Sequence, residues 1–164
     1  MPIPDQPVAG HGWASGEMVS HYRLVEALEQ CGPGELCRAR DTRTGRTVAI
    51  RLLPPAATAD PLARAHHLRR AVSMRELSHP NIAMVFDAGV HRARVFVAFE
   101  YHAGQSLRTA TTDGRVPVSR ALDWSIQIAS AVSAAHAAGY IHRGLSADTI
   151  VVTAKDRVKI PSLD

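Results

Sequence analysis

The chain has 164 residues, of which 46% are hydrophobic and 21% are charged, and it carries a formal net charge of +4. A chain of this size and composition can bury the core of one domain or of two small lobes, which argues against a disordered protein. The basic residues are spread along the chain rather than gathered in a dense block, so we expect no nucleic-acid partner.

The sequence also lacks the features of secretion and membrane insertion. No apolar run approaches the roughly 20 residues that cross a bilayer, and the N-terminus has no basic flank followed by an apolar core. Cys31 and Cys37 are too few and too close together for a secreted disulfide framework, so we expect reduced thiols. Together these observations predict a cytoplasmic protein without a membrane span.

The first part of the chain predicts a tail, then an antiparallel sheet with one helix. Residues 1–20 mix Pro, Gly and Ser with isolated apolar residues, which is typical of a flexible tail. Beyond Tyr22, β-favouring runs alternate with glycine-containing turns. The predicted strands are 22–25, 35–39, 47–51, 82–86 and 94–100, with turns at 32–34, 44–46 and 87–89. Apolar residues at helical spacing predict one amphipathic helix over about 61–78.

Beyond Gly104 the pattern changes. Residues 118–138 form a long alanine-rich segment whose apolar side chains point in most directions around a helix, which predicts burial on every side. Two short strands are predicted at 149–153 and 157–160, with Lys155 and Asp156 at the turn between them.

Four local motifs, met in a fixed order, resemble the bacterial-type Ser/Thr protein kinase family. Val48-Ala49-Ile50-Arg51 stands where the family has V-A-I-K, and His79-Pro80-Asn81-Ile82 matches the common H-P-N-I. Phe99-Glu100-Tyr101 resembles the hinge, and residues 142–149 match H-R-D-L-K-P-x-N in spacing. The ordered set covers about 140 residues and is far more specific than any single match.

The resemblance implies a kinase-like α+β fold. It consists of a five-stranded antiparallel N-lobe with one regulatory helix, followed by the beginning of a mainly helical C-lobe. On this interpretation residues 1–20 are the tail, 21–102 the N-lobe and hinge, and 103–164 a partial C-lobe that ends at the position equivalent to D-F-G.

The resemblance also implies that the groups needed for phosphoryl transfer are replaced. Kinases use a lysine oriented by a helix glutamate, a catalytic aspartate followed by a lysine, and an asparagine and a second aspartate that hold magnesium. In that order, the equivalent residues here are Arg51, Arg70, Gly144, Ser146, Thr149 and Ser162.

These replacements predict that no catalytic residue is intact and that no metal site is present. Gly144 has no side chain to accept a proton, and the neutral hydroxyls of Thr149 and Ser162 are poor ligands for a hard divalent cation, so we expect no magnesium. Asp148 and Asp164 are nearby carboxylates offset in sequence, which leaves open an atypical kinase that uses one of them.

Two further changes affect the phosphate side of the expected site. Glu29 and Cys31 occupy the first two glycine positions of the phosphate-covering turn, and only Gly34 remains aligned. Arg51 and Arg70 would face each other, and two like charges about 4 Å apart repel by about 4 kcal/mol at an effective dielectric constant of 20. We therefore expect either that the regulatory helix swings outward or that an anion lies between the two guanidinium groups.

The apolar positions, in contrast, are retained. The resemblance implies that Leu36, Ala49 and Val151 enclose an adenine ring, with Arg51 on the phosphate side and backbone groups around Glu100 and His102 at the hinge. Phe99 would be the gatekeeper. The residues expected to form the spine between the lobes are Met74, Val85, His142 and Leu163. Weak ATP binding without catalysis is thus left open.

The leading hypothesis is a catalytically impaired pseudokinase that acts as a regulatory or protein-binding module. An uncovered apolar face on the helix over 118–138 would fit a protein partner or an oligomer. The alternatives are a weak or atypical ATP-binding Ser/Thr kinase and a nonfunctional fragment of a longer kinase or a decayed gene. The sequence names neither the partner nor the pathway.

Overall fold

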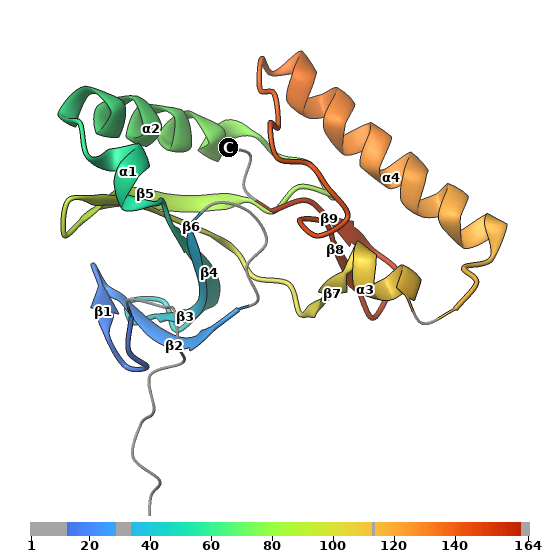
Figure 1. The fold of residues 1–164 in the computed structure, drawn as a ribbon, viewed down its shortest axis with the longest axis horizontal. Coiled ribbons are helices and arrows are strands. Elements are labelled where there is room, and N and C mark those ends of the chain that lie inside the picture. Colours follow the sequence, from blue (N-terminus) through green and yellow to red (C-terminus); the bar gives the residue numbers. More distant parts are fainter. Residues whose placement is uncertain (1–12, 29–33, 113, 162–164) are drawn as a thin grey trace, which may run out of the picture.

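The computed structural model describes residues 13–28, 34–112 and 114–161, which form two lobes (Figure 1). The first lobe is built on a six-stranded antiparallel sheet with the strand order β1-β2-β3-β4-β6-β5. Its strands are β1 (Met18–Val19), β2 (Tyr22–Ala27), β3 (Glu35–Asp41), β4 (Thr47–Leu52), β5 (Val85–His91) and β6 (Arg94–Glu100). The predicted α+β class and antiparallel N-lobe are confirmed, with β1 added to the five expected strands.

One face of this sheet is covered by α2 (Pro61–Ser73), which follows the short α1 (Pro55–Thr58). Asp60 caps α2 because its Oδ2 accepts a hydrogen bond from the Ala63 amide at 2.8 Å, and Pro61 stands at the first helical position. The helix ends earlier than residue 78, because the chain tightens after Ser73 into the 3-10 turn η1 (Met74–Glu76).

The second lobe holds a small antiparallel sheet and two helices. Strands β7 (Gly104–Ser106), β8 (Val151–Thr153) and β9 (Val158–Lys159) form the sheet, and α3 (Leu107–Thr112) follows β7 directly. The long helix α4 (Val118–Ala137) lies alongside (Figure 1). This agrees with the expected start of a mainly helical lobe. Among the described residues, none of the helices combines the length and apolar character needed to cross a bilayer.

The large sheet separates two clusters of buried side chains. Side chains alternate between the faces of a strand, so neighbouring residues of β4 enter different clusters. Leu36, Ala49, Val97 and Phe99 face α2 and the second lobe, whereas Tyr22, Ile50, Leu52 and Phe96 form the core on the opposite face. β4 therefore contributes to both cores, and Val48 to Leu52 are all at most 3% exposed.

The N-terminal boundary differs from the predicted one. The sequence predicts a tail up to Ser20, yet Met18–Val19 pairs with β2, and Val19 is fully buried. Trp13 packs on the β5–β6 hairpin, where the Arg92 and Arg94 guanidinium groups each lie 5.7 Å from the centroid of its ring. The tail prediction is wrong for this stretch, because cation–π and strand contacts hold it on the sheet. Residues 1–12 lie outside the described part of the chain.

The hairpin turn between β5 and β6 is also displaced from its predicted position. β5 runs through residues 87–89, and the chain reverses at Arg92 and Ala93, whose φ angles are 48° and 62°. Gly89 has a packing role instead, because a Cβ atom there would lie 2.7 Å from the Phe96 ring. A glycine inside a strand marks such a close approach as readily as a turn.

Burial of α4 is one-sided, so the predicted burial on every side is wrong within the described chain. Trp124, Ala131 and Ala135 are buried, while Leu122 is 57% and Ile126 is 65% exposed. The Trp124 ring also lies under the guanidinium group of Arg120, 4.9 Å from its centroid. The helix thus presents the uncovered apolar face that the leading hypothesis anticipates.

The two lobes are joined through the buried amide of Asn81. Its Nδ2 donates to the side-chain Oε1 of Gln127 on α4 at 2.8 Å and to the backbone oxygen of Val158 on β9 at 2.9 Å. Gln127 Oε1 in turn accepts from the Val158 amide at 2.8 Å. The backbone of residues 81–83 pairs with Ile160, with Ile82 in a parallel bridge to it. Asn81 is 5% exposed, so this polar junction lies within the core.

We expect Asn81→Ala to lower the free energy of unfolding by about 2–3 kcal/mol, because it leaves the buried Val158 carbonyl without its donor. Urea denaturation followed by far-UV circular dichroism measures the change. Gln105→Ala, which removes an exposed amide on β7, is the matched control and should stay within about 0.5 kcal/mol. Equal effects of the two substitutions would contradict the role assigned to Asn81.

Gly34, just before β3, should tolerate a side chain less well than Gly16 does. Its φ is +90°, and a Cβ atom would lie 2.1 Å from the Leu52 carbonyl oxygen. We expect Gly34→Ala to destabilise by about 2–4 kcal/mol in the same denaturation assay. Gly16 has a similar φ of +85° but open space around it, so Gly16→Ala should cost only about 1 kcal/mol. A Gly34 variant no less stable than the Gly16 variant would show that the contact with Leu52 is unimportant.

Candidate functional site

Two of the residues expected around adenine belong to the apolar cluster that packs against α2. Leu36 and Ala49 are 9% and 3% exposed and belong to one apolar cluster with Phe99. Val151 is only partly buried at the start of β8, and its neighbour Val152 is the core residue. The structure thus brings Leu36 and Ala49 together on one face, while the adenine contact itself stays a prediction.

Leu28 is a residue of this face that sequence reasoning missed. It is partly buried against the same cluster, and its amide donates to the Leu36 carbonyl at 2.8 Å. A β-bulge between Leu24 and Glu26 shifts the register, so Leu28 faces the side opposite to Leu24. Simple alternation along the strand would place both leucines on one face, and no local motif announces the bulge.

The two arginines expected on the phosphate side occupy different environments. Arg51 is 3% exposed on β4, between Leu36 and Val97 on the neighbouring strands. Arg70, on α2, donates from Nη2 to the Ile141 backbone oxygen at 3.0 Å, across the lobes. The helix arginine therefore ties α2 to the segment just before His142. The predicted repulsion between Arg51 and Arg70, and its relief by an anion, stay predictions.

The loop over residues 142–149 is held together by its own polar groups. The Gly144 amide donates a hydrogen bond to His142 Nδ1 at 3.1 Å. Thr149 Oγ1 accepts from the Ser146 amide at 2.9 Å and also lies 3.2 Å from the Gly144 oxygen and 3.0 Å from the Ser146 oxygen. Thr149 is only 7% exposed, so its hydroxyl closes the loop rather than pointing outward.

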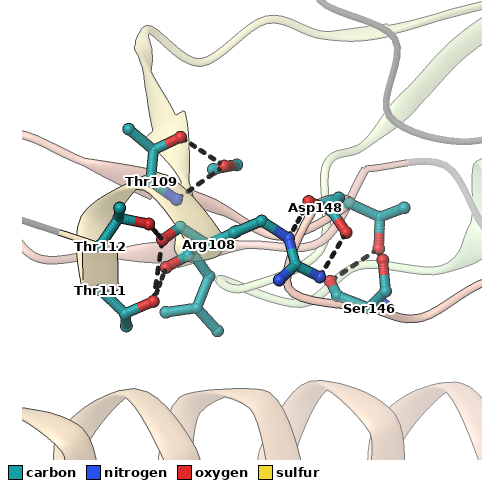
Figure 2. Close-up of polar contacts among 9 residues, drawn as sticks. Arg108, Thr109, Thr111, Thr112, Ser146 and Asp148 are labelled. Carbon is teal, nitrogen blue, oxygen red and sulfur yellow. Dashed lines mark hydrogen bonds and ion pairs between the residues drawn. The ribbon is translucent and has the colours of Figure 1, made fainter.

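Asp148 is engaged by a cation from α3 (Figure 2). Arg108 binds the Asp148 carboxylate with two nitrogen atoms, and the Nη2 to Oδ2 distance is 2.8 Å. The hydrogen bond from Arg108 lowers the pKa of Asp148 below its usual range, so the carboxylate is ionised and paired. In Figure 2 the Thr111 and Thr112 hydroxyls also donate to the Arg108 carbonyl, each at 2.8 Å.

At the hinge, the Glu100 side chain faces the second lobe. Its Oε2 lies 3.1 Å from His102 Nε2 and 3.8 Å from Lys159 Nζ on β9. Burial alone would raise the pKa of Glu100, but the contacts with His102, Lys159 and the Met84 amide outweigh it and lower the pKa. The Glu100 amide donates to the Met84 carbonyl at 2.9 Å. Glu100 and His102 therefore help to connect the lobes, and their expected backbone contacts with adenine remain a prediction.

The remaining predicted positions divide between buried and undescribed residues. Met74 and Val85 are 3% and 4% exposed, and His142 is partly buried, which suits the expected spine without showing its contacts. The other residues predicted for the site lie outside the described part of the chain, namely Glu29, Cys31, Ser162, Leu163 and Asp164. Within the described ranges no group of three or more His, Cys, Asp or Glu side chains could hold a metal ion.

Comparison with known proteins places this geometry in one family. Residues 23–163 match the family model described as protein tyrosine and serine/threonine kinase. The serine/threonine-protein kinase PknD of Mycobacterium tuberculosis is 35% identical over 142 residues, which cover 86% of this chain and 21% of PknD. The probable serine/threonine-protein kinase SCO3848 of Streptomyces coelicolor is 33% identical over 144 residues, which cover 85% of this chain and 21% of SCO3848.

Among solved structures, the PknI kinase domain of Mycobacterium tuberculosis matches with a TM-score of 0.77 and 26% identity, covering 92% of this chain and 62% of that one. With respect to full length, the chain spans about one fifth of PknD and of SCO3848. The antiparallel first lobe, α2 against it and the start of the second lobe are shared with that kinase domain. The chain therefore belongs to the protein kinase family, as a relative of bacterial serine/threonine kinases.

Proposed function

We propose that this kinase-family domain is catalytically impaired and acts as a regulatory or protein-binding module. The observation that carries the proposal is the state of the loop over residues 142–149. Gly144 offers no proton acceptor where the family uses an aspartate, and the buried Thr149 hydroxyl is engaged with the backbone of the same loop. Gly144 thus supplies no carboxylate for the substrate proton, and Thr149 supplies no amide oxygen where the family's asparagine would hold the metal.

The main rival is a weak or atypical kinase that uses Asp148 as its base. The contacts of Asp148 speak against that role. Its carboxylate is held by two nitrogen atoms of Arg108, and its lowered pKa makes it a poorer proton acceptor. An atypical reaction would first have to break this charge-assisted pair.

Nucleotide binding is the part of kinase function that the described residues support best. Leu28, Leu36 and Ala49 gather on one apolar face, which suits a flat adenine ring. We expect no magnesium in this site, and the engagement of the Thr149 hydroxyl and the Asp148 carboxylate within the protein supports that expectation. The proposal therefore includes weak, magnesium-independent binding of ATP, in a cytoplasmic protein with a protein partner.

A second alternative is that this domain is a nonfunctional part of a longer kinase. It is favoured by the coverage, since the chain spans 21% of PknD. A remnant of this kind should aggregate or lack fixed tertiary packing when expressed alone. Near-UV circular dichroism therefore separates this alternative from a folded module.

Phosphoryl transfer should be undetectable. We expect radiolabel incorporation from γ-labelled ATP, into the chain itself and into casein, no greater than for heat-denatured chain, because Gly144 provides no base. An active bacterial serine/threonine kinase in parallel is the positive control. Incorporation that Asp148→Asn abolishes would overturn the proposal in favour of the rival. Incorporation that survives Asp148→Asn but not Asp164→Asn would overturn it as well.

ATP should raise the melting temperature equally in EDTA and in magnesium, because Thr149 replaces the asparagine that would hold the metal and the Asp148 carboxylate is paired with Arg108. A fluorescence thermal-shift titration measures this. Tripolyphosphate serves as the control for attraction to arginine charge alone, and it should give a smaller shift than ATP because it lacks the adenine that the apolar face would bury. A shift that requires magnesium would contradict the proposed metal independence.

A further inference from the structure

An open groove of about 550 Å³ lies beside the hinge, and none of its lining residues belongs to the cluster that holds Leu36 and Ala49. His102 and Ala103 line it from the segment between β6 and β7, and Pro80 lines it from the loop before β5. The rest of its lining comes from the β8–β9 hairpin. Its size is typical of a binding site rather than of a packing defect.

The lining of this groove is cationic. Lys155, Arg157 and Lys159 all contribute to it, and no carboxylate does. Lys159 is partly neutralised by Glu100, which also contacts His102. Among the described residues, no carboxylate lies within ion-pair distance of Lys155 or Arg157, and both are exposed. These two cations dominate the charge of the groove.

Asp156, at the hairpin tip between the two cations, does not cancel them. Its φ of 57° belongs to the tight turn, and Arg120 on α4 binds its Oδ1 through Nε at 3.0 Å and Nη2 at 2.5 Å. A second groove, of about 520 Å³, shares Lys155 and Arg157 on the other side of the hairpin but also contains Asp123 and Asp156. The second groove has mixed charge, and the groove behind the hinge has one sign.

Strand addition at β9 is not available to a partner. The Val158 carbonyl and amide are bonded to Asn81 and Gln127, and the Ile160 amide donates to the Asn81 carbonyl at 2.8 Å. Because the backbone of this edge is already paired, a partner must be recognised through the side chains of the groove.

We propose that this groove binds an acidic peptide segment of a partner protein, with Lys155 and Arg157 as the principal contacts. The proposal rests on the protein-binding role proposed above and names the class of partner. Small side chains, Ala103 and Ala154, form part of the groove and allow a chain to approach closely. The lining contains no Phe, Tyr or Trp, and the ring of its one histidine, His102, is engaged with Glu100, so a peptide fits it better than a single strand of nucleic acid.

Fluorescence anisotropy tests the proposal with the full chain and three labelled probes. The first probe is a peptide that alternates Glu and Leu, the second replaces every Glu by Gln, and the third is an oligo-dT strand. We expect the acidic peptide to bind, the Gln peptide to bind at least roughly tenfold more weakly, and affinity for the acidic peptide to fall as salt rises. The oligo-dT strand should bind more weakly than the acidic peptide.

The variant Lys155→Glu/Arg157→Glu should weaken binding of the acidic peptide by roughly tenfold or more, because charge reversal turns attraction into repulsion. Both side chains are exposed, so circular dichroism should show an unchanged fold. Arg23→Glu/Arg43→Glu makes the same change in net charge on exposed residues of the first lobe and should leave the affinity within about twofold.

Three results would overturn the proposal: no binding of the acidic peptide, equal loss of affinity in both double variants, or tighter binding of oligo-dT that the groove variant removes. The last result would assign the groove to nucleic acid. None of them changes the expected absence of phosphoryl transfer, so failure of the groove proposal is distinguishable from failure of the proposed impairment.

Discussion

The side-chain amide of Asn81 is the constraint on which the relation between the two lobes depends. One buried nitrogen reaches both α4, through Gln127, and the β8–β9 hairpin, through the Val158 carbonyl. A polar group in a core must be satisfied, because an unmade hydrogen bond in a low-dielectric interior costs more than the bond contributes when formed. The network therefore permits one arrangement of the loop before β5, the helix and the hairpin. The hinge groove, which Pro80 and the β8–β9 hairpin line, is built on that arrangement.

Polar groups in and around the expected site are engaged with the protein itself. Arg70 binds the Ile141 carbonyl, Asp148 is paired with Arg108, and Thr149 bonds to its own loop. Each contact ties a residue near the expected site to its surroundings. The hydrogen bonds of Thr149 close the loop over residues 142–149 on itself.

Much of the fold was predictable because hydrophobic pattern and local motifs are short-range signals. β6 was predicted with the bounds it has, and α4 within one residue at its end, since both are long and strongly patterned. The misplaced turn at residues 87–89 has a physical cause, because Gly89 makes room for Phe96 across the strand pair. The strand at Met18 was missed because two residues carry almost no periodicity, and their order depends on a partner strand.

The candidate site was predictable as a set of positions but not as a set of contacts. The resemblance located Thr149 and Asp148, yet only the fold shows that the first closes its loop and that the second meets Arg108, forty residues away. Leu28 was missed because a bulge, which depends on pairing with β3, reverses the side to which it points. Contacts between residues far apart in sequence lie beyond what spacing alone can supply.

The positions of the tryptophans have a spectroscopic consequence. The chain has two, and the structure places Trp13 on the β5–β6 hairpin and Trp124 within α4, one in each lobe. Trp13 lies close to two arginine guanidinium groups and Trp124 to one. Replacing either indole by phenylalanine would leave a single tryptophan, so the tryptophan emission of each lobe could be followed separately without an added dye.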